Sequence, residues 1–119
     1  IPPKSEKTTI NNMNIQHQID LVRDWGKTKG IIGANGTGTE KAQTMKLIEE
    51  VEELVEANFK NDHDEKIDAI GDCTVVLILL ADIIGVSFED CLEKAYQIIS
   101  NRTGEMVDGT FVKDTKLTK

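Results

Sequence analysis

Apolar residues recur along the chain at intervals that predict helices. Five of them keep helical spacing and predict a first helix over about residues 14–28: Ile15, Ile19, Leu21, Val22 and Trp25. A second helix is expected to start at Thr37-Gly38-Thr39-Glu40, which has the spacing of a capping box. Its apolar stripe steps by three or four residues along one face and is expected to pack on the core: Leu47, Ile48, Val51, Leu54, Val55 and Phe59.

Two further helices complete the pattern. The third is expected over about residues 64–84 and is apolar nearly all round from Val75 to Ala81, so it needs cover on every side. Such a helix lies at the centre of a bundle or in a subunit interface. Ser87-Phe88-Glu89-Asp90 is expected to cap a fourth helix running to about Arg102. Four helices with short connections predict an all-α fold of the four-helix-bundle type.

The remaining segments read as termini and connections. Residues 1–13 are polar, hold both prolines and predict a flexible N-terminal arm. The glycine-rich segment 30–39 lacks the Gly-Lys-Ser/Thr ending of a P-loop, so we interpret it as a flexible connection, with closure over a substrate as the alternative. Asp108-Gly109 between apolar pairs indicates a short hairpin. The expected division is an arm over 1–13, a helical domain over 14–103 and a hairpin or tail over 104–119.

Length and cysteine content bound the class of protein. A chain of 119 residues fits one domain with a real core. The opening residues show no basic-then-apolar leader, and the longest apolar stretch, Cys73–Ala81, is far shorter than the ~20 residues of a membrane span. Cys73 and Cys91 sit among apolar residues and favour a reduced environment. We therefore expect a soluble, cytoplasmic protein without a membrane partner.

The charge of the chain is concentrated in one window. The net charge of −7 argues against binding to polymeric nucleic acid or anionic lipid. Residues 49–72 hold ten acidic and two basic side chains, whereas the rest of the chain holds 11 acidic and 12 basic ones. One pair of predicted helices therefore carries the whole negative charge.

The acidic window has two interpretations. On a helical wheel Glu50 and Glu53 are neighbours at one edge of the second helix, and Asp68 and Asp72 share a face of the third. Lysine partners at i+4 exist only for Glu56 and Asp62 in this window, and Asp72 opens directly into the apolar run, where an unpaired carboxylate is costly. Converging carboxylates of this kind are typical of Mg²⁺ or Mn²⁺ sites. The alternative is a solvated acidic face.

Two motifs resemble a known family. Residues 46–54 contain Glu49-Glu50-x-x-Glu53, and residues 68–72 end on Asp72 at the head of an apolar helix. In this order the motifs resemble the MazG-like branch of the all-α nucleoside triphosphate pyrophosphohydrolases, whose pattern is Glu-Glu-x-x-Glu, a spacer and Glu-x-x-Asp. The resemblance covers roughly residues 14–113, and its later part is similar to short single-domain MazG proteins of phages. The chain departs from the pattern at Ala69, where the family has Glu; the adjacent acid is Asp68.

The resemblance implies Mg²⁺-dependent hydrolysis of (deoxy)nucleoside triphosphates to monophosphate and pyrophosphate, with Mn²⁺ as a substitute ion. It implies Glu50, Glu53 and Asp72 as metal ligands, with Asp68 as a further candidate. Glu49 is the candidate for another ligand or for the base that activates water. The candidate substrate-binding residues are Lys46, Lys94 and Arg102 for the phosphates and Trp25, Asn35 and Tyr96 for the base or sugar.

Other assignments stay open at this point. Within the same class, the chain could be a dUTP diphosphatase or a phosphoribosyl-ATP pyrophosphohydrolase. In a different class, it could be a helical interaction module whose acidic face meets a basic partner. Because related enzymes build their sites at subunit interfaces and the third helix needs cover, a homodimer or a dimer of dimers is expected.

Overall fold

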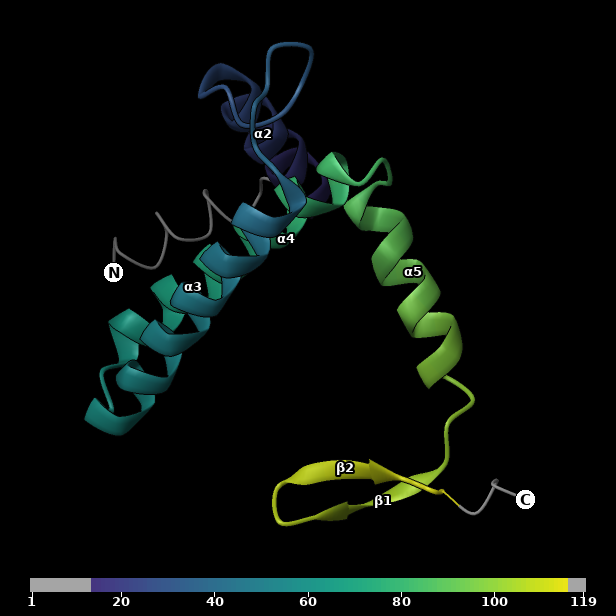
Figure 1. The fold of residues 1–119 in the computed structure, drawn as a ribbon. Helices are drawn as coiled ribbons and strands as arrows, with labels where there is room; N and C mark the ends of the chain where they lie inside the picture. The colour runs from purple at the N-terminus through teal and green to yellow at the C-terminus, as the bar shows by residue number, and fades with distance from the viewer. Residues whose placement is uncertain (1–13, 116–119) are drawn as a thin grey trace. The chain divides into compact units, whose positions relative to one another are not determined.

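The computed structural model describes residues 14–115, which form two compact units that divide between Phe88 and Glu89 (Figure 1). The first unit contains helices α2 (Ile15–Thr28), α3 (Glu40–Lys60) and α4 (His63–Ile83). Helix α5 (Phe88–Ile99) begins at the boundary and is followed by strands β1 (Gly104–Val107) and β2 (Thr110–Lys113). The prediction of an all-α fold with a small C-terminal hairpin is confirmed. The arm predicted over 1–13 lies outside the described residues.

Local side-chain hydrogen bonds set the starts of the helices in the first unit. The side chain of Asn14 accepts from the His17 backbone N–H at 2.8 Å, and that of Asp62 accepts from Glu65 N–H at 3.1 Å. The N-cap of α3 is Thr39, two residues after Thr37, because the hydroxyl of Thr39 accepts from Ala42 N–H at 3.1 Å. The capping box proposed to begin at Thr37 is therefore wrong, and Thr37 belongs to the preceding loop.

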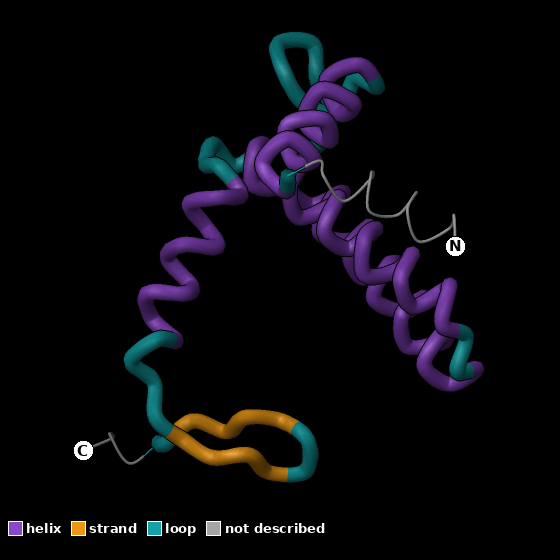
Figure 2. The backbone as a smooth tube through the Cα atoms, turned by 180° about the vertical axis from the view of Figure 1, so that it is seen from behind, coloured by secondary structure: helices purple, strands orange, loops and turns teal. Residues whose placement is uncertain are grey.

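Helices α3 and α4 form an antiparallel pair, visible along their length from both sides (Figures 1 and 2). Asn61 joins them in a left-handed conformation, with φ of 54°. Ala57 and Ala69 are 0% and 3% exposed, and their small side chains let the two backbones approach closely. Helix α2 packs on α4 at Gly26, where an added Cβ would lie only 2.6 Å from Cδ2 of the buried Leu79.

The apolar stripe of α3 does not face the interior of the first unit. Within α3, only Glu50 and Ala57 are buried, seven residues apart on one face. Four residues of the predicted stripe are between 44% and 87% exposed: Ile48, Val51, Val55 and Phe59. The expectation that this stripe packs on the core is therefore wrong for the first unit, since a neighbouring face of α3 meets α4 instead.

The glycine-rich loop between α2 and α3 folds back on itself. Thr37 N–H donates to Gly30 O at 3.0 Å, and Gly38 N–H donates to Ile31 O at 2.9 Å. A Cβ on Gly36 would lie 2.4 Å from the carbonyl carbon of Ile32, so glycine is required where the two arms of the loop touch. The loop is thus held by backbone hydrogen bonds, and its closure over a substrate stays a prediction.

In the second unit, α5 is shorter than predicted. It ends at Ile99, after which Ser100 donates from Oγ to Gln97 O at 3.1 Å and competes with the helical pattern. Arg102, predicted on this helix, lies instead in the connection to β1. The hairpin is confirmed: Asp108 and Gly109 have φ of 49° and 90° and turn β1 into the antiparallel β2.

Two further observations bear on the environment of the chain. Cys73 and Cys91 are free thiols. Between residues 14 and 115, no single helix has both the length and the apolar composition of a membrane span. The bent pair of α4 and α5 meets these two criteria only when both helices are counted together.

Candidate metal centre

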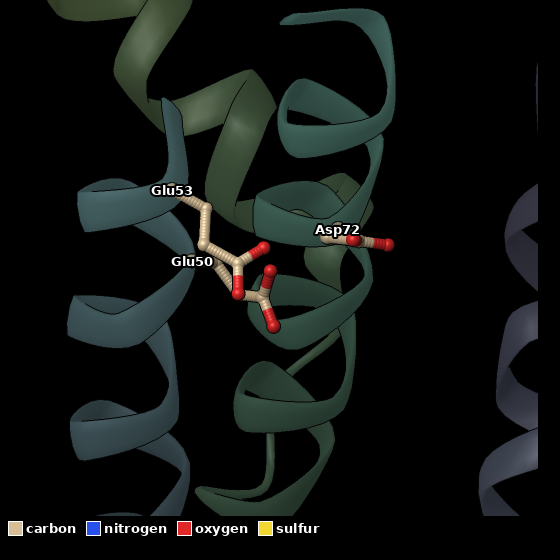
Figure 3. A group of neighbouring side chains, drawn as sticks. All are labelled: Glu50, Glu53 and Asp72. Atoms are coloured by element: carbon tan, nitrogen blue, oxygen red, sulfur yellow. The ribbon is translucent and has the colours of Figure 1, made fainter. Parts of the chain in front are cut away.

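Three carboxylates from the two long helices converge on one point. Glu50 and Glu53 lie one turn apart on α3, and Asp72 lies on the facing part of α4 (Figure 3). One carboxylate oxygen from each residue lies within 4.8 Å of the other two. Figure 3 shows the carboxylates of Glu50 and Glu53 next to each other at the side of α3. The antiparallel pairing of α3 and α4 therefore brings both halves of the sequence motif to one place.

Glu50 is the buried member of this group. Its side chain is 9% exposed, and its Oε2 lies 3.4 Å from Nζ of Lys46. Its other oxygen, Oε1, is buried and accepts no hydrogen bond from any of the residues that the structure describes. A buried acceptor without a partner is costly, so this oxygen indicates a ligand that the chain does not itself supply.

Electrostatics point to a positively charged ligand. The pKa of Glu53 is raised above its ordinary value, first by the charge of Glu50 and then by partial desolvation and the charge of Asp72. The pKa of Asp72 is also raised, by desolvation first and then by the charges of Asp68 and Glu50. Both carboxylates thus lie in a negative field that Lys46 offsets only in part. A hard divalent cation fits such a set of oxygen donors.

Lys46 is the cation of the cluster. Its Nζ lies 3.5 Å from Oε1 of Glu49 and 3.4 Å from Oε2 of Glu50. Hydrogen bonding to Glu50, followed by the charge of Glu49, raises the pKa of Lys46 above its ordinary value. Lys46 therefore neutralises part of the charge of these two glutamates from the turn before them, although neither has a lysine four residues after it.

Two other predicted residues lie at the edge of the group. The side chain of Glu49 is 65% exposed and is held by its ion pair with Lys46. Asp68 is exposed and lies outside the group of three, although its charge raises the pKa of Asp72. Ala69, at the position of the family's missing acid, is 3% exposed in the α3–α4 contact. Whether Asp68 replaces that acid stays a prediction.

A cavity of about 410 Å³ adjoins the carboxylates, with walls from α2, α3 and α4. Five of the predicted site residues line it: Trp25, Lys46, Glu49, Glu50 and Asp72. Asn35 lies in the glycine-rich loop and does not line it. Lys94, Tyr96 and Arg102 belong to the second unit, so their part in the site stays a prediction.

Gln43 lines the same cavity and was missed by the sequence analysis. It lies seven residues before Glu50, so two helical turns place both side chains on one face of α3. That spacing was readable from the sequence. The cavity itself was not, because it needs α2 and α4 in place.

Comparison with known proteins bears on the whole of this site. The family model described as phosphoribosyl-ATP pyrophosphohydrolase matches residues 34–97, which include the three converging carboxylates. An uncharacterized 18.2 kDa protein of Haemophilus phage HP1, from its rep-hol intergenic region, is 34% identical over 68 residues, covering 57% of this chain and 40% of the phage protein. The chain thus spans less than half of that relative. No solved structure matches the chain. Because the family model covers more than half of the residues, the chain belongs to the phosphoribosyl-ATP pyrophosphohydrolase family, a family of nucleotide pyrophosphohydrolases.

Proposed function

We propose that this protein is a MazG-like enzyme that hydrolyses (deoxy)nucleoside triphosphates to the monophosphate and pyrophosphate. The observation that carries the proposal is the buried, unpartnered Oε1 of Glu50 beside the carboxylates of Glu53 and Asp72, inside the segment that matches the family. A phosphate chain is repelled by such carboxylates unless a cation lies between them. We infer that Mg²⁺, or Mn²⁺ in its place, is that cation.

The chain's own residues divide the remaining work. Glu50, Glu53 and Asp72 would hold the metal ion, which when bound would neutralise charge on the phosphoryl oxygens. Lys46 lies beside them and donates its N–H groups to the phosphates. Glu49, which lines the cavity and has a side chain 65% exposed, accepts a proton from the attacking water. The water oxygen forms a bond to phosphorus, the bond to the bridging oxygen breaks, and pyrophosphate leaves with the electron pair.

A second candidate substrate is phosphoribosyl-ATP, which the name of the matching family favours. Its hydrolysis breaks the same kind of phosphoanhydride bond, so the carboxylate cluster does not discriminate between the two substrates. A third is dUTP, for which a dUTP diphosphatase would show a strong preference. The choice rests on the groups that contact the base and sugar rather than on the metal site.

The proposal is tested by pyrophosphate release across a panel of the common ribo- and deoxyribonucleoside triphosphates, dUTP and phosphoribosyl-ATP. We expect release from several triphosphates in the presence of Mg²⁺, none with a chelator, and loss of activity in Glu53→Gln. Glu52→Gln is the matched control, because Glu52 is an exposed neighbour on α3 that lies outside the cluster. If Mg²⁺ and Mn²⁺ leave the Tm unchanged and Glu53→Gln changes neither the Tm nor the activity, the result would favour the interaction module instead.

We also propose that the exposed face of α3 and α4 is covered by a second copy of the chain, in a homodimer or a dimer of dimers. On α3 the open apolar residues are 44–87% exposed, and on α4 Ile67 and Ile70 are each 58% exposed. Large apolar side chains left exposed on two neighbouring helices favour an interaction site there. Light scattering after gel filtration is expected to show an oligomer that Val55→Asp dissociates. Lys60→Gln lowers the charge by the same one unit on the side of α3 opposite the apolar stripe, and it is expected to leave the oligomer intact.

A further inference from the structure

The cavity beside the carboxylates has two chemically different ends. Away from the cluster its walls are apolar, with Trp25 at the end of α2, Ile31 in the following loop, and Val75, Val76 and Leu79 on α4. At the cluster end it meets Lys46, Glu50 and Asp72. A volume of about 410 Å³ lies within the usual range for small-molecule sites, about 300–1,000 Å³. Its ligand should therefore carry a charged group at one end and an apolar group at the other.

Two polar groups in the apolar part lack partners. Neither the side-chain amide of Gln43 nor the indole N–H of Trp25 makes a hydrogen bond with any residue between 14 and 115. Gln43 is partly buried, and Trp25 is 47% exposed and lines the cavity. An apolar group that also has hydrogen-bonding atoms at its edge would use both.

The spacing along α3 relates these groups to the metal centre. Gln43 and Glu50 are separated by seven residues, which is roughly 10 Å along a helix axis. A nucleotide has the same order of groups, with a flat base at one end, the phosphates at the other and a sugar between them. The faces of a base are apolar enough to stack on an aromatic ring, whereas its edge holds donors and acceptors.

We propose that this cavity binds the base of the substrate, with Trp25 as the stacking surface and Gln43 as the residue that reads the edge of the base. The proposal rests on the proposed function only in taking a nucleotide as the ligand. A glutamine amide offers one donor and one acceptor side by side, and it can turn over. It therefore pairs with any base edge that presents a donor next to an acceptor, which predicts tolerance among bases.

The same chemistry predicts how specificity changes. A carboxylate at position 43 only accepts hydrogen bonds, so it suits an edge with two adjacent donors. Guanine has such an edge, formed by its ring N–H and its exocyclic amine, whereas adenine does not. Gln43→Glu is therefore expected to favour guanine over adenine nucleotides, and because one bidentate pair is worth about 1–3 kcal/mol, the preference should shift by about 5- to 150-fold.

The single tryptophan of the chain gives a direct readout of the cavity. The protein with Mg²⁺ is titrated with nucleoside monophosphates and with ribose 5-phosphate, which has the sugar and phosphate but no base. We expect a saturable change in Trp25 fluorescence with the nucleotides and none with ribose 5-phosphate. Equal responses to both, or no response to any nucleotide, would overturn the proposal. A parallel titration of N-acetyltryptophanamide corrects for light absorbed by the bases.

The second arm compares GMP and AMP affinities, from the same fluorescence signal, in the wild type, Gln43→Glu and Asn58→Asp. Asn58→Asp makes the same amide-to-carboxylate change at an exposed position of α3 away from the cavity. We expect the affinity ratio to move toward GMP in Gln43→Glu alone. An unchanged ratio in that variant, or an equal change in Asn58→Asp, would refute the role of Gln43.

These binding measurements are independent of turnover. If no nucleotide yields pyrophosphate but the fluorescence results are as expected, the base site stands and the proposed reaction fails. If pyrophosphate is released but the GMP-to-AMP ratio is the same in Gln43→Glu as in the wild type, the reaction stands and the base site fails.

Discussion

Replacing Asp72 by Asn should stabilise the metal-free protein and remove its response to metal. The substitution keeps the shape of the side chain and deletes one charge. An oxygen of Asp72 lies within 4.8 Å of one of Glu50. Two unit charges at this distance repel by roughly 3 kcal/mol at an effective dielectric constant of about 20. Since Asp72 is partly open to water, we expect a net gain of about 1 kcal/mol, or about 4–8 °C in Tm for a domain of this size.

Bound metal should reverse the order of the Tm values of the wild type and Asp72→Asn. A ligand at 100 times its Kd stabilises a folded protein by about 2.7 kcal/mol, so saturating Mg²⁺ should raise the Tm of the wild type above that of Asp72→Asn. The assay is thermal unfolding followed by circular dichroism, in EDTA and in Mg²⁺, at one protein concentration. Glu52→Gln is expected to behave like the wild type. A lower Tm of Asp72→Asn in EDTA, together with an unchanged Mg²⁺ response, would refute the reasoning.

Three further predictions follow from the structure. The pKa values of Glu53 and Asp72 are raised in the fold, so the native state binds more protons than the unfolded chain as these groups titrate. In EDTA the free energy of unfolding should therefore rise as pH falls from neutral toward the raised pKa values. Urea titrations isolate this contribution as the difference between wild type and Glu53→Gln, and a difference with the opposite slope would contradict the prediction. Leu79→Ala should lower the free energy of unfolding by about 2–5 kcal/mol, because it leaves a cavity in the α2–α4 contact. Gly26→Ala should lower it by about 1–3 kcal/mol, because the added Cβ would clash with Leu79. A free energy of unfolding in urea equal to that of the wild type would refute either prediction. Asp68→Asn should keep the Mg²⁺-induced rise in Tm, since its carboxylate lies outside the group of three, whereas loss of that rise would show that Asp68 replaces the acid missing at Ala69.

Local chemistry made much of the fold predictable. The hairpin follows from Asp108-Gly109, since this pair adopts the positive φ angles of a tight turn. The meeting of Glu50 and Glu53 with Asp72 follows from helical spacing on each helix and from the short connection that makes α3 and α4 antiparallel. In both cases the geometry follows from local conformation: a two-residue turn in the hairpin, and regular helical spacing with a two-residue connection between α3 and α4.

Packing between helices was less predictable. The helical wheel identified the apolar stripe around Val51, but it could not say which surface covers that stripe. Within the first unit a different face of α3, with Glu50 and Ala57, meets α4 because the alanines allow close approach. The position of Gln43 in a cavity could not be predicted for the same reason, because the cavity forms only where α2 and α4 pack beside α3.

The most direct test of the account is the identity of the products formed from a nucleoside triphosphate. We predict that ³¹P NMR of a reaction with Mg²⁺ shows a nucleoside monophosphate and pyrophosphate in equal amounts, and that Glu53→Gln forms neither. Release of orthophosphate and a nucleoside diphosphate, or no reaction with any member of the nucleotide panel, would contradict the assignment of the carboxylate cluster as a pyrophosphohydrolase site.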